Sequence, residues 1–372
     1  MTISPSVSVE TPSRLGAIRQ TVRRAPGATS LTSSYTVLLK SVTEAGLLRR
    51  RTGFYVWLFI GLTLALGGLT AGFFLLGDSW YQLLIAGGLG ILLTQFAFIT
   101  HEASHRQVFK SGPVNDWIGR VLATGVVGIS YAWWMNKHTR HHGNPNMVGR
   151  DPDIEWDTIS FTEEDASKQK GLLRWITQRQ GYLFFPLLTL EGINLHFRSI
   201  MMLFRKGRLE GRALEITLIA LRLSVYVAVV FWFLPLGMAF AFLGVQLAVF
   251  GVYMGASFAP NHKGMPLIPK GTRIDFFSKQ VLTSRNISGR GTTALMGGLN
   301  YQIEHHLFPS MARPHLRRAR DMVKAHCEAQ GISYTETTLG KSYGIVINYL
   351  NKVGLAARDP FDCPEHSRFR RR

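Results

Sequence analysis

Histidines recur in this sequence at the spacing of one helical turn. Eight of the twelve histidines lie in HEASH, HTRHH, APNHK and QIEHH, as His101, His105, His138, His141, His142, His262, His305 and His306. Residues at i and i+3 or i+4 share one face of a helix. Each segment with several of these residues is therefore expected to point them in one direction. Neutral imidazole binds Fe, Zn, Cu and Ni, so this pattern indicates a metal site.

The number of imidazoles argues against a single zinc ion, which usually takes four ligands. Two metal ions with about four histidines each is the simplest division. Soluble carboxylate di-iron bundles need paired Glu-x-x-His motifs and further glutamates, and here only Glu102 and His105 form such a motif. A histidine-rich di-iron centre that activates dioxygen fits better.

Three more polar residues are candidates for direct ligands or for partners of the ligands. Gln302 stands three residues before His305, and Asn261 directly precedes His262. His196 lies in an apolar run, where its ring needs a hydrogen-bond partner. It either supports a ligand or is a core histidine. The three remaining histidines, His315, His326 and His366, are expected to be structural or solvated.

The elements that must position these residues are four apolar runs, each long enough to cross a bilayer core of about 30 Å. They are residues 54–76, 80–100, 215–234 and 238–259. Short turns join the first to the second and the third to the fourth, so we expect an all-α membrane protein with two transmembrane hairpins. Arg222, inside the third run, is expected to reach the near interface or to face the protein interior. Polar groups interrupt two further apolar patches, 117–134 and 182–204, which predicts interfacial or buried helices.

The charge of the chain has a plain cause in a membrane protein. Only 17% of its 372 residues are charged and 46% are hydrophobic, yet the net charge is +19. The two turns carry no Lys or Arg, so the positive-inside rule places both termini and the loop between the hairpins in the cytoplasm. Attraction to anionic headgroups then accounts for the excess charge, and no nucleic acid partner is expected. The two cysteines, Cys327 and Cys363, have no metal, redox or disulfide spacing.

The expected organisation has three parts. Residues 1–53 form a basic cytoplasmic segment that looks partly disordered and has no cleavable signal peptide. Residues 54–330 form the membrane domain with its cytoplasmic helical cap, which holds the histidines. Residues 331–372 form a basic cytoplasmic C-terminal segment.

HEASH, HTRHHGNPNMVGRDPDI and NYQIEHHLFP together resemble the three histidine boxes of the membrane fatty acid desaturases. The resemblance covers about residues 50 to 330. It implies four transmembrane helices under a cytoplasmic cap, two iron ions bound by histidines, and dioxygen-dependent insertion of a cis double bond into a long acyl chain. By position, the seven histidines of the boxes would be iron ligands, and His262 matches the extra histidine after the last span.

Gln302 stands where many members of this family have His. The form QxxHH resembles the front-end branch and also some bacterial acyl-CoA desaturases, so the double-bond position stays open. No HPGG motif of a fused cytochrome b5 is present, and we expect a separate electron donor, a ferredoxin or a flavin reductase. The expected location is a bacterial plasma membrane. The acyl carrier could be CoA, a phospholipid or acyl carrier protein, and Lys137 and Arg140 are candidates to hold a CoA or phospholipid head group.

Two features near the second box have more than one interpretation. Asp151 and Asp153 either orient ligand histidines or form a turn around Pro152. Trp133 and Trp134 either line an acyl tunnel or pack at the interface.

A hydroxylase on the same scaffold would have the same metal site and differ only in product. A metal transporter would have ionisable residues inside the spans, and Arg222 is the only clear one.

Overall fold

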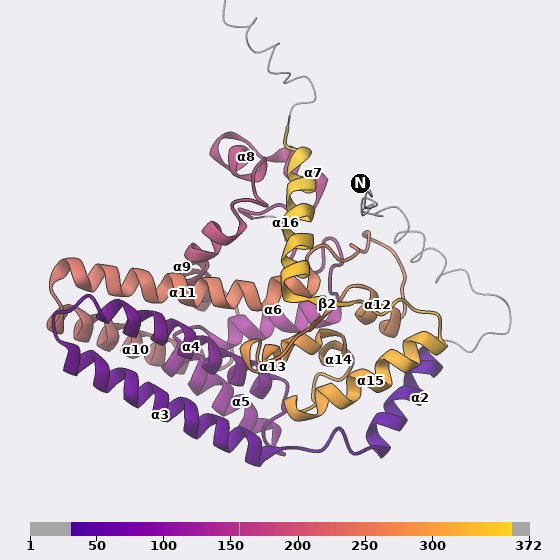
Figure 1. Cartoon of the computed structure of the whole chain (residues 1–372), viewed down its shortest axis with the longest axis horizontal. Helices are drawn as coiled ribbons and strands as arrows, with labels where there is room; N and C mark the ends of the chain where they lie inside the picture. Colours follow the sequence, from indigo (N-terminus) through magenta and orange to yellow (C-terminus); the bar gives the residue numbers. More distant parts are fainter. Residues whose placement is uncertain (1–30, 156, 359–372) are drawn as a thin grey trace, which may run out of the picture.

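The computed structural model describes residues 31–155 and 157–358, which are mainly helical (Figure 1). The expected segments 1–53 and 331–372 lie partly outside the described residues. In chain order the elements are α2 Leu31–Glu44, α3 Thr52–Leu76, α4 Gln82–Ser104, α5 Gly112–Val121, the π-helical η1 Leu122–Val127, α6 Tyr131–Gly143, α7 Glu163–Lys168, α8 Gly171–Thr177, α9 Phe184–Leu203, α10 Arg212–Phe233, α11 Leu236–His262, α12 Phe276–Leu282, β1 Asn286–Ser288, α13 Thr292–Leu295, the 3₁₀ turn η2 Leu299–Tyr301, α14 Gln302–Leu307, α15 Arg313–Ala329, β2 Glu336–Thr338 and α16 Leu339–Leu355.

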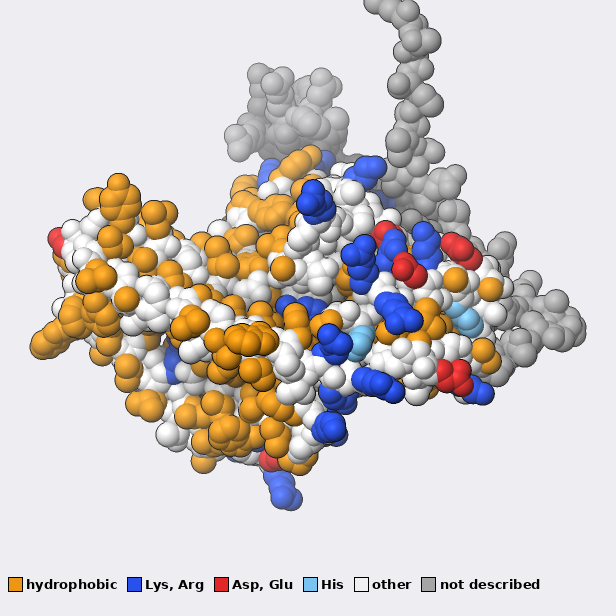
Figure 2. Space-filling model, turned by 60° about the horizontal axis from the view of Figure 1, so that its bottom comes forward, with side chains coloured by type: hydrophobic (Ala, Val, Ile, Leu, Met, Phe, Trp, Pro, Cys, Tyr) orange, Lys and Arg blue, Asp and Glu red, His pale blue; other side chains and the backbone are white. Residues whose placement is uncertain are grey.

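Four helices, α3, α4, α10 and α11, are long and apolar enough to cross a membrane. They match the four predicted spans to within a few residues at each end. Two of them continue beyond the C-terminal end of the apolar run: α4 to Ser104 and α11 to His262. Apolar side chains cover the half of the surface formed by these helices, whereas Lys and Arg gather on the other half (Figure 2).

Glycines of α4 and α9 bring the backbones of these helices into direct contact with α11. A Cβ added to Gly192 of α9 would lie 2.2 Å from the Leu247 carbonyl oxygen of α11, and one on Gly90 of α4 would lie 2.8 Å from the Gln246 carbonyl oxygen. Both distances are too short for any side chain, so α11 is held directly between α4 and α9. This contact holds the middle of α11, the helix that ends at His262.

The polar half has its own apolar core, formed by α2, α12, α14 and α15. Leu38 and Val42 of α2 are buried against this core. Leu31–Glu44, within the N-terminal segment that looks partly disordered from the sequence, is thus an ordered helix. Strands β1 and β2 pair in parallel, Asn286 with Glu336 and Ser288 with Thr338, and α16 packs along α11.

Arg222 faces the protein interior, one of the two expected placements. Its Nε donates to the Val126 carbonyl oxygen at 3.1 Å, and its guanidinium lies 4.9 Å from the ring centroid of Tyr226. Val126 belongs to η1, so Arg222 satisfies a main-chain acceptor at the end of a π-helical turn. The patch 117–134 forms α5, η1 and the start of α6, and 182–204 forms α9, neither of which is a candidate span.

Candidate metal centre

The eight predicted histidines converge in two adjacent groups. The larger group contains His101, His105, His138, His142 and His305, and the smaller one His141, His262 and His306. Within each group, ligand atoms lie within 4.8 Å of one another. The groups are in contact, since the rings of His142 and His306 stack with centroids 4.2 Å apart.

Histidines that are adjacent in the sequence belong to different groups. Neighbouring residues point about 100° apart on a helix with 3.6 residues per turn, so His141 and His142 of α6 diverge, as do His305 and His306 of α14. The expectation that each segment points its imidazoles one way holds only for residues four apart, His101 with His105 and His138 with His142; His138 and His141, three apart, lie in different groups. The observed division is five and three.

In the larger group, the ring nitrogens face each other directly. The Nε2 atoms of His105 and His138 are 2.7 Å apart, and those of His142 and His305 are 3.1 Å apart. Two nitrogens at ~2.1 Å from one ion, in adjacent ligand positions, lie about 3 Å apart. His101 Nε2 is buried and has no hydrogen-bond partner among the described residues. This arrangement fits a metal ion as the shared partner of the ring nitrogens.

In the smaller group, a separate acceptor faces each Nδ1. His262 Nδ1 lies 3.0 Å from the Thr283 carbonyl oxygen, and His306 Nδ1 lies 2.8 Å from Gln280 Oε1. Gln280 is oriented because its Nε2 donates to the His142 carbonyl oxygen. An acceptor at Nδ1 places the hydrogen there and leaves the Nε2 lone pair free, as is usual for metal-bound histidine.

Asp151 is the acceptor for the third ring. Its Oδ1 lies 3.0 Å from His141 Nδ1, while its Oδ2 accepts from the main-chain N–H of Asn146. Asp151 therefore both orients a candidate ligand and stabilises the turn, so the two interpretations were not exclusive. Asp153 forms an ion pair with Lys137 at 2.9 Å.

Burial keeps these rings neutral, which is the state that binds metal. It lowers the pKa of His105 to about 3 and holds the pKa values of His138, His142, His305 and His306 well below their ordinary range. At His141 burial also opposes protonation, but Asp151 and Asp153 more than offset it and raise the pKa. His306 Nε2 is buried without a partner, like His101 Nε2. A buried unsatisfied nitrogen is costly, and a metal ligand role would remove that cost, so the residues fit a metal centre.

Residues 78–338 of the sequence match the fatty acid desaturase family. The chain belongs to this family. It is 30% identical to Delta(8)-fatty-acid desaturase 2 of Arabidopsis thaliana, over 75% of this chain and 65% of the relative. It is 27% identical to Delta(6)-fatty-acid desaturase fat-3 of Caenorhabditis elegans, over 87% and 75%. It is 29% identical to Acyl-lipid (9-3)-desaturase of Borago officinalis, over 73% and 63%.

The chain thus spans between 63% and 75% of the length of these three desaturases. All three come from eukaryotes, so they give no support to the bacterial plasma membrane expected from the sequence. The membrane character that the family implies agrees with the four long apolar helices.

In this desaturase, Gln302 lies beside the smaller histidine group. Its Nε2 is 3.0 Å from His262 Nε2, and its Oε1 accepts from Asn261 Nδ2 at 3.2 Å. The side chain thus faces the same ring nitrogen that a metal would use. Asn261 contacts Gln302, and its Nδ2 also donates to the Ser257 carbonyl oxygen.

His196 lies in the helical core at η1 instead. Its Nδ1 is 2.7 Å from the Gly192 carbonyl oxygen and its Nε2 is 3.3 Å from the Val127 carbonyl oxygen. A neutral ring donates from one nitrogen only, and the nearer Gly192 carbonyl oxygen is the better placed acceptor, which agrees with the interpretation as a core histidine. The basic residues expected to hold a head group are already paired, Lys137 with Asp153 and Arg140 with Glu155 at 2.6 Å.

Several residues that support the site were not found from the sequence. Glu102, next to His101, forms an ion pair with Arg313 of α15. Glu304, next to His305, accepts from Asn286 Nδ2 at 2.7 Å and from the Tyr334 hydroxyl at 2.8 Å. Burial raises the pKa of Glu304 to about 7. The sequence signal was a glutamate within the first and the third box, Glu102 and Glu304. The partners of these glutamates lie far away in the sequence.

Proposed function

We propose that the chain is a dioxygen-dependent fatty acyl desaturase whose two histidine groups hold two iron ions. The observation that carries the proposal is the pair of adjacent groups of buried and half-buried histidines, three of them with Nδ1 facing an acceptor. With dioxygen, iron bound there would supply the oxidising power to remove two hydrogens from neighbouring unactivated carbons of an acyl chain. The acyl chain gives two electrons and a donor gives two more, and dioxygen is reduced to two waters.

Three acceptors around the centre orient the ligands: the Thr283 main-chain carbonyl and the side chains of Gln280 and Asp151. Thr283, Gln280 and Asp151 each hold one ring of the smaller group through Nδ1. Gln302 is proposed as a further ligand or partner of that group, through either atom of its amide. The electron donor is proposed to be a separate ferredoxin or flavin reductase.

The proposed topology is two transmembrane hairpins, α3–α4 and α10–α11, under a helical cap that faces the cytoplasm together with both termini. The support is the charge distribution. The turn between α3 and α4 contains Asp78 and no Lys or Arg, whereas Arg49, Arg50 and Arg51 precede α3 on the other side. Positive charge is retained in the cytoplasm during insertion.

The proposed product has its new double bond between an existing one and the carboxyl end of the chain. Two observations support this front-end position. The third box has Gln302 in its first position, and the relatives named above are Delta(8)-, Delta(6)- and acyl-lipid (9-3)-desaturases.

Expression in a host that makes only saturated and monounsaturated lipids, with a reductase and ferredoxin supplied, tests the proposal. Fatty acids are derivatised, and the double-bond positions are read by mass spectrometry. We expect a new double bond nearer the carboxyl end in the wild type and none in His305→Ala, His306→Ala. Hydroxylated fatty acids would assign the chain to the hydroxylases instead. A first double bond in a saturated chain would contradict the front-end position.

A further inference from the structure

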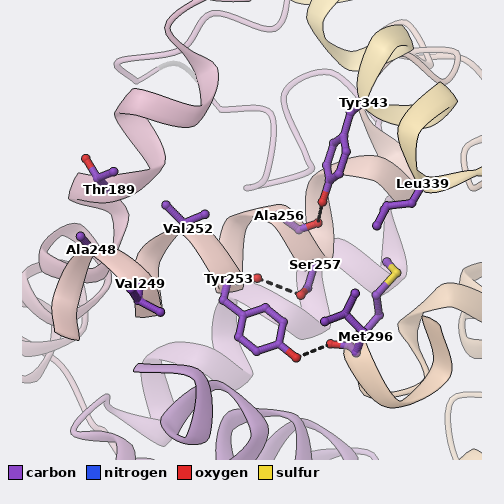
Figure 3. Close-up of a pocket in the computed structure, with 11 residues that line it drawn as sticks. Thr189, Ala248, Val249, Val252, Tyr253, Ala256, Ser257, Met296, Leu339 and Tyr343 are labelled. Carbon is purple, nitrogen blue, oxygen red and sulfur yellow. Dashed lines mark hydrogen bonds between the residues drawn. The ribbon is translucent and has the colours of Figure 1, made fainter. Parts of the chain in front are cut away.

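A groove of about 400 Å³ runs along α11 on the side that faces α9 and α16 (Figure 3). Its walls come from four parts of the chain: α9, the second half of α11, α13 with the following Met296, and the start of α16. The volume falls in the ~300–1,000 Å³ range of small-molecule sites. The groove therefore has the size of a ligand site and is separate from the histidine groups.

The side chains that line the groove favour a hydrocarbon ligand. No lining side chain is charged, and each hydroxyl already donates to a main-chain carbonyl. Tyr253 donates to Leu295 at 2.6 Å, Tyr343 to Ala256 at 2.8 Å and Ser257 to Tyr253 at 2.8 Å (Figure 3); the fourth, Thr189, donates to Pro186 at 2.6 Å. A polar head group would find no free donor here, so recognition rests on apolar contact.

The floor of the groove is connected to the smaller histidine group. The Ser257 carbonyl oxygen accepts from Asn261 Nδ2 at 3.1 Å, and the same Nδ2 donates to Gln302 Oε1. Gln302 in turn lies 3.0 Å from His262 Nε2. The α11 side chains that line the groove thus follow the helix from Ala248 to Ser257, in the direction of His262.

In the proposed topology, the groove lies at the depth of the bilayer interior. Ala248 and Ser257, near its two ends on α11, precede His262 by fourteen and five residues, which is about 21 and 7.5 Å of helix. The neighbouring α9 exposes Leu190, Ile193 and other large apolar side chains by more than half. A helix with that surface contacts lipid, so the groove is accessible to the tails of membrane lipids.

We propose that this groove admits the acyl chain of a membrane phospholipid sideways from the bilayer, and that the substrate is an acyl-lipid instead of a soluble acyl-CoA. The inference rests on the proposed desaturase function for the identity of the reaction. The inference identifies a phospholipid as the acyl carrier. An acyl tail that already lies in the bilayer can enter a groove at that depth without leaving the hydrocarbon region.

The test uses the full chain in vesicles of phosphatidylcholine with a diazirine in one acyl chain. Irradiation followed by peptide mapping locates the labelled residues. Val252→Trp and Ala248→Trp fill the groove at two levels, ten and fourteen residues from His262. Leu221→Trp, at a side chain of α10 that is 60% exposed, is the matched lipid-facing control. Thermal unfolding and iron content are measured for each variant, so that a folding defect is recognised.

We expect the wild type to be labelled on α11 within residues 248–257. Labelling of these residues should be at least tenfold lower in a folded Val252→Trp or Ala248→Trp variant. It should be unchanged in Leu221→Trp. Uniform labelling of all lipid-facing helices would overturn the proposal. In the activity arm, the same oleoyl chain is supplied either as phosphatidylcholine or as oleoyl-CoA, and the groove variants should lose turnover of the phospholipid at least tenfold.

The two proposals fail in different ways. Turnover of oleoyl-CoA alone, unaffected by Val252→Trp and Ala248→Trp, would overturn the groove and leave the desaturase function intact. Specific labelling of the groove without product from either substrate would keep the groove as a lipid-tail site and contradict the proposed function.

Discussion

Glu102 and Arg313 form a buried, bidentate ion pair that connects the first histidine box to helix α15. Arg313 Nε lies 2.8 Å from Glu102 Oε1 and Nη2 lies 2.6 Å from Oε2, with both side chains no more than 5% exposed. Tyr55 of α3 donates to Glu102 Oε1 and accepts from the Arg313 main-chain N–H. The pair thus joins a span helix, the metal centre and the polar half of the molecule.

Arg313→Met is expected to destabilise the protein by about 3–5 kcal/mol, because it leaves the Glu102 carboxylate buried without a counter-charge. The double variant Glu102→Gln, Arg313→Met should lose less, since no charge stays buried alone. Unfolding in a graded detergent series gives both values. Arg106→Gln is the surface control: Arg106 pairs with Asp116 but is 61% exposed, so we expect a loss below about 1 kcal/mol. Equal losses at Arg313 and Arg106 would contradict the structural role.

Asp151→Ala is expected to weaken iron binding about 10- to 100-fold, because His141 loses the acceptor that orients its ring. Asp151→Asn should retain more affinity, since its amide oxygen can still accept from Nδ1. Competition with a calibrated chelator measures the affinity of each purified variant. Asp157→Ala, which removes a carboxylate paired with Arg198, serves as the control. Wild-type affinity in Asp151→Ala would show that His141 needs no support.

Gln302→Leu tests whether the group of three histidines needs a fourth polar partner. We expect tightly held iron to fall from two ions to one per chain, because the smaller group retains only His141, His262 and His306. Gln246→Leu removes another buried glutamine, which accepts from the Tyr226 hydroxyl in the helical core, and should leave the iron content unchanged. Two ions per chain in Gln302→Leu would exclude a required role for the amide.

The contact between α9 and α11 predicts different outcomes for two glycines. Gly192→Ala places a Cβ 2.2 Å from the Leu247 carbonyl oxygen, and overpacking of this kind costs about 1–3 kcal/mol. Gly67→Ala, with no atom within 4 Å of its added Cβ, should be neutral or stabilising by about 0.5–1 kcal/mol, as usual within a helix. Thermal midpoints of the two variants in one detergent check the direction, and the reverse order would contradict the close contact.

The histidine clustering and the spans could be predicted from the sequence because both are local. Helical spacing brings His101 and His105, or His138 and His142, onto one face, and an uninterrupted apolar run defines a span. The same spacing could not show that His141 and His306 turn to a second group. That division depends on how α6 and α14 are rotated toward each other, which packing decides.

The supporting residues could not be predicted because they are distant in sequence. Arg313 lies 211 positions from Glu102, and the acceptor for His262 is a main-chain carbonyl at Thr283, which no residue type marks. The helix α2 was missed for a related reason. Its polar composition resembles a disordered segment, and only the core of α12, α14 and α15 gives Leu38 and Val42 a place to be buried.

Iron quantification with Mössbauer spectroscopy on the purified protein tests the central claim most directly. The protein is expressed with enriched iron, and iron per chain is determined beside zinc. The division of the histidines into five and three predicts two iron ions per chain in two different environments, seen as two quadrupole doublets of equal area, and less than one ion in His305→Ala, His306→Ala. A single iron per chain, or zinc in place of iron, would contradict the di-iron account.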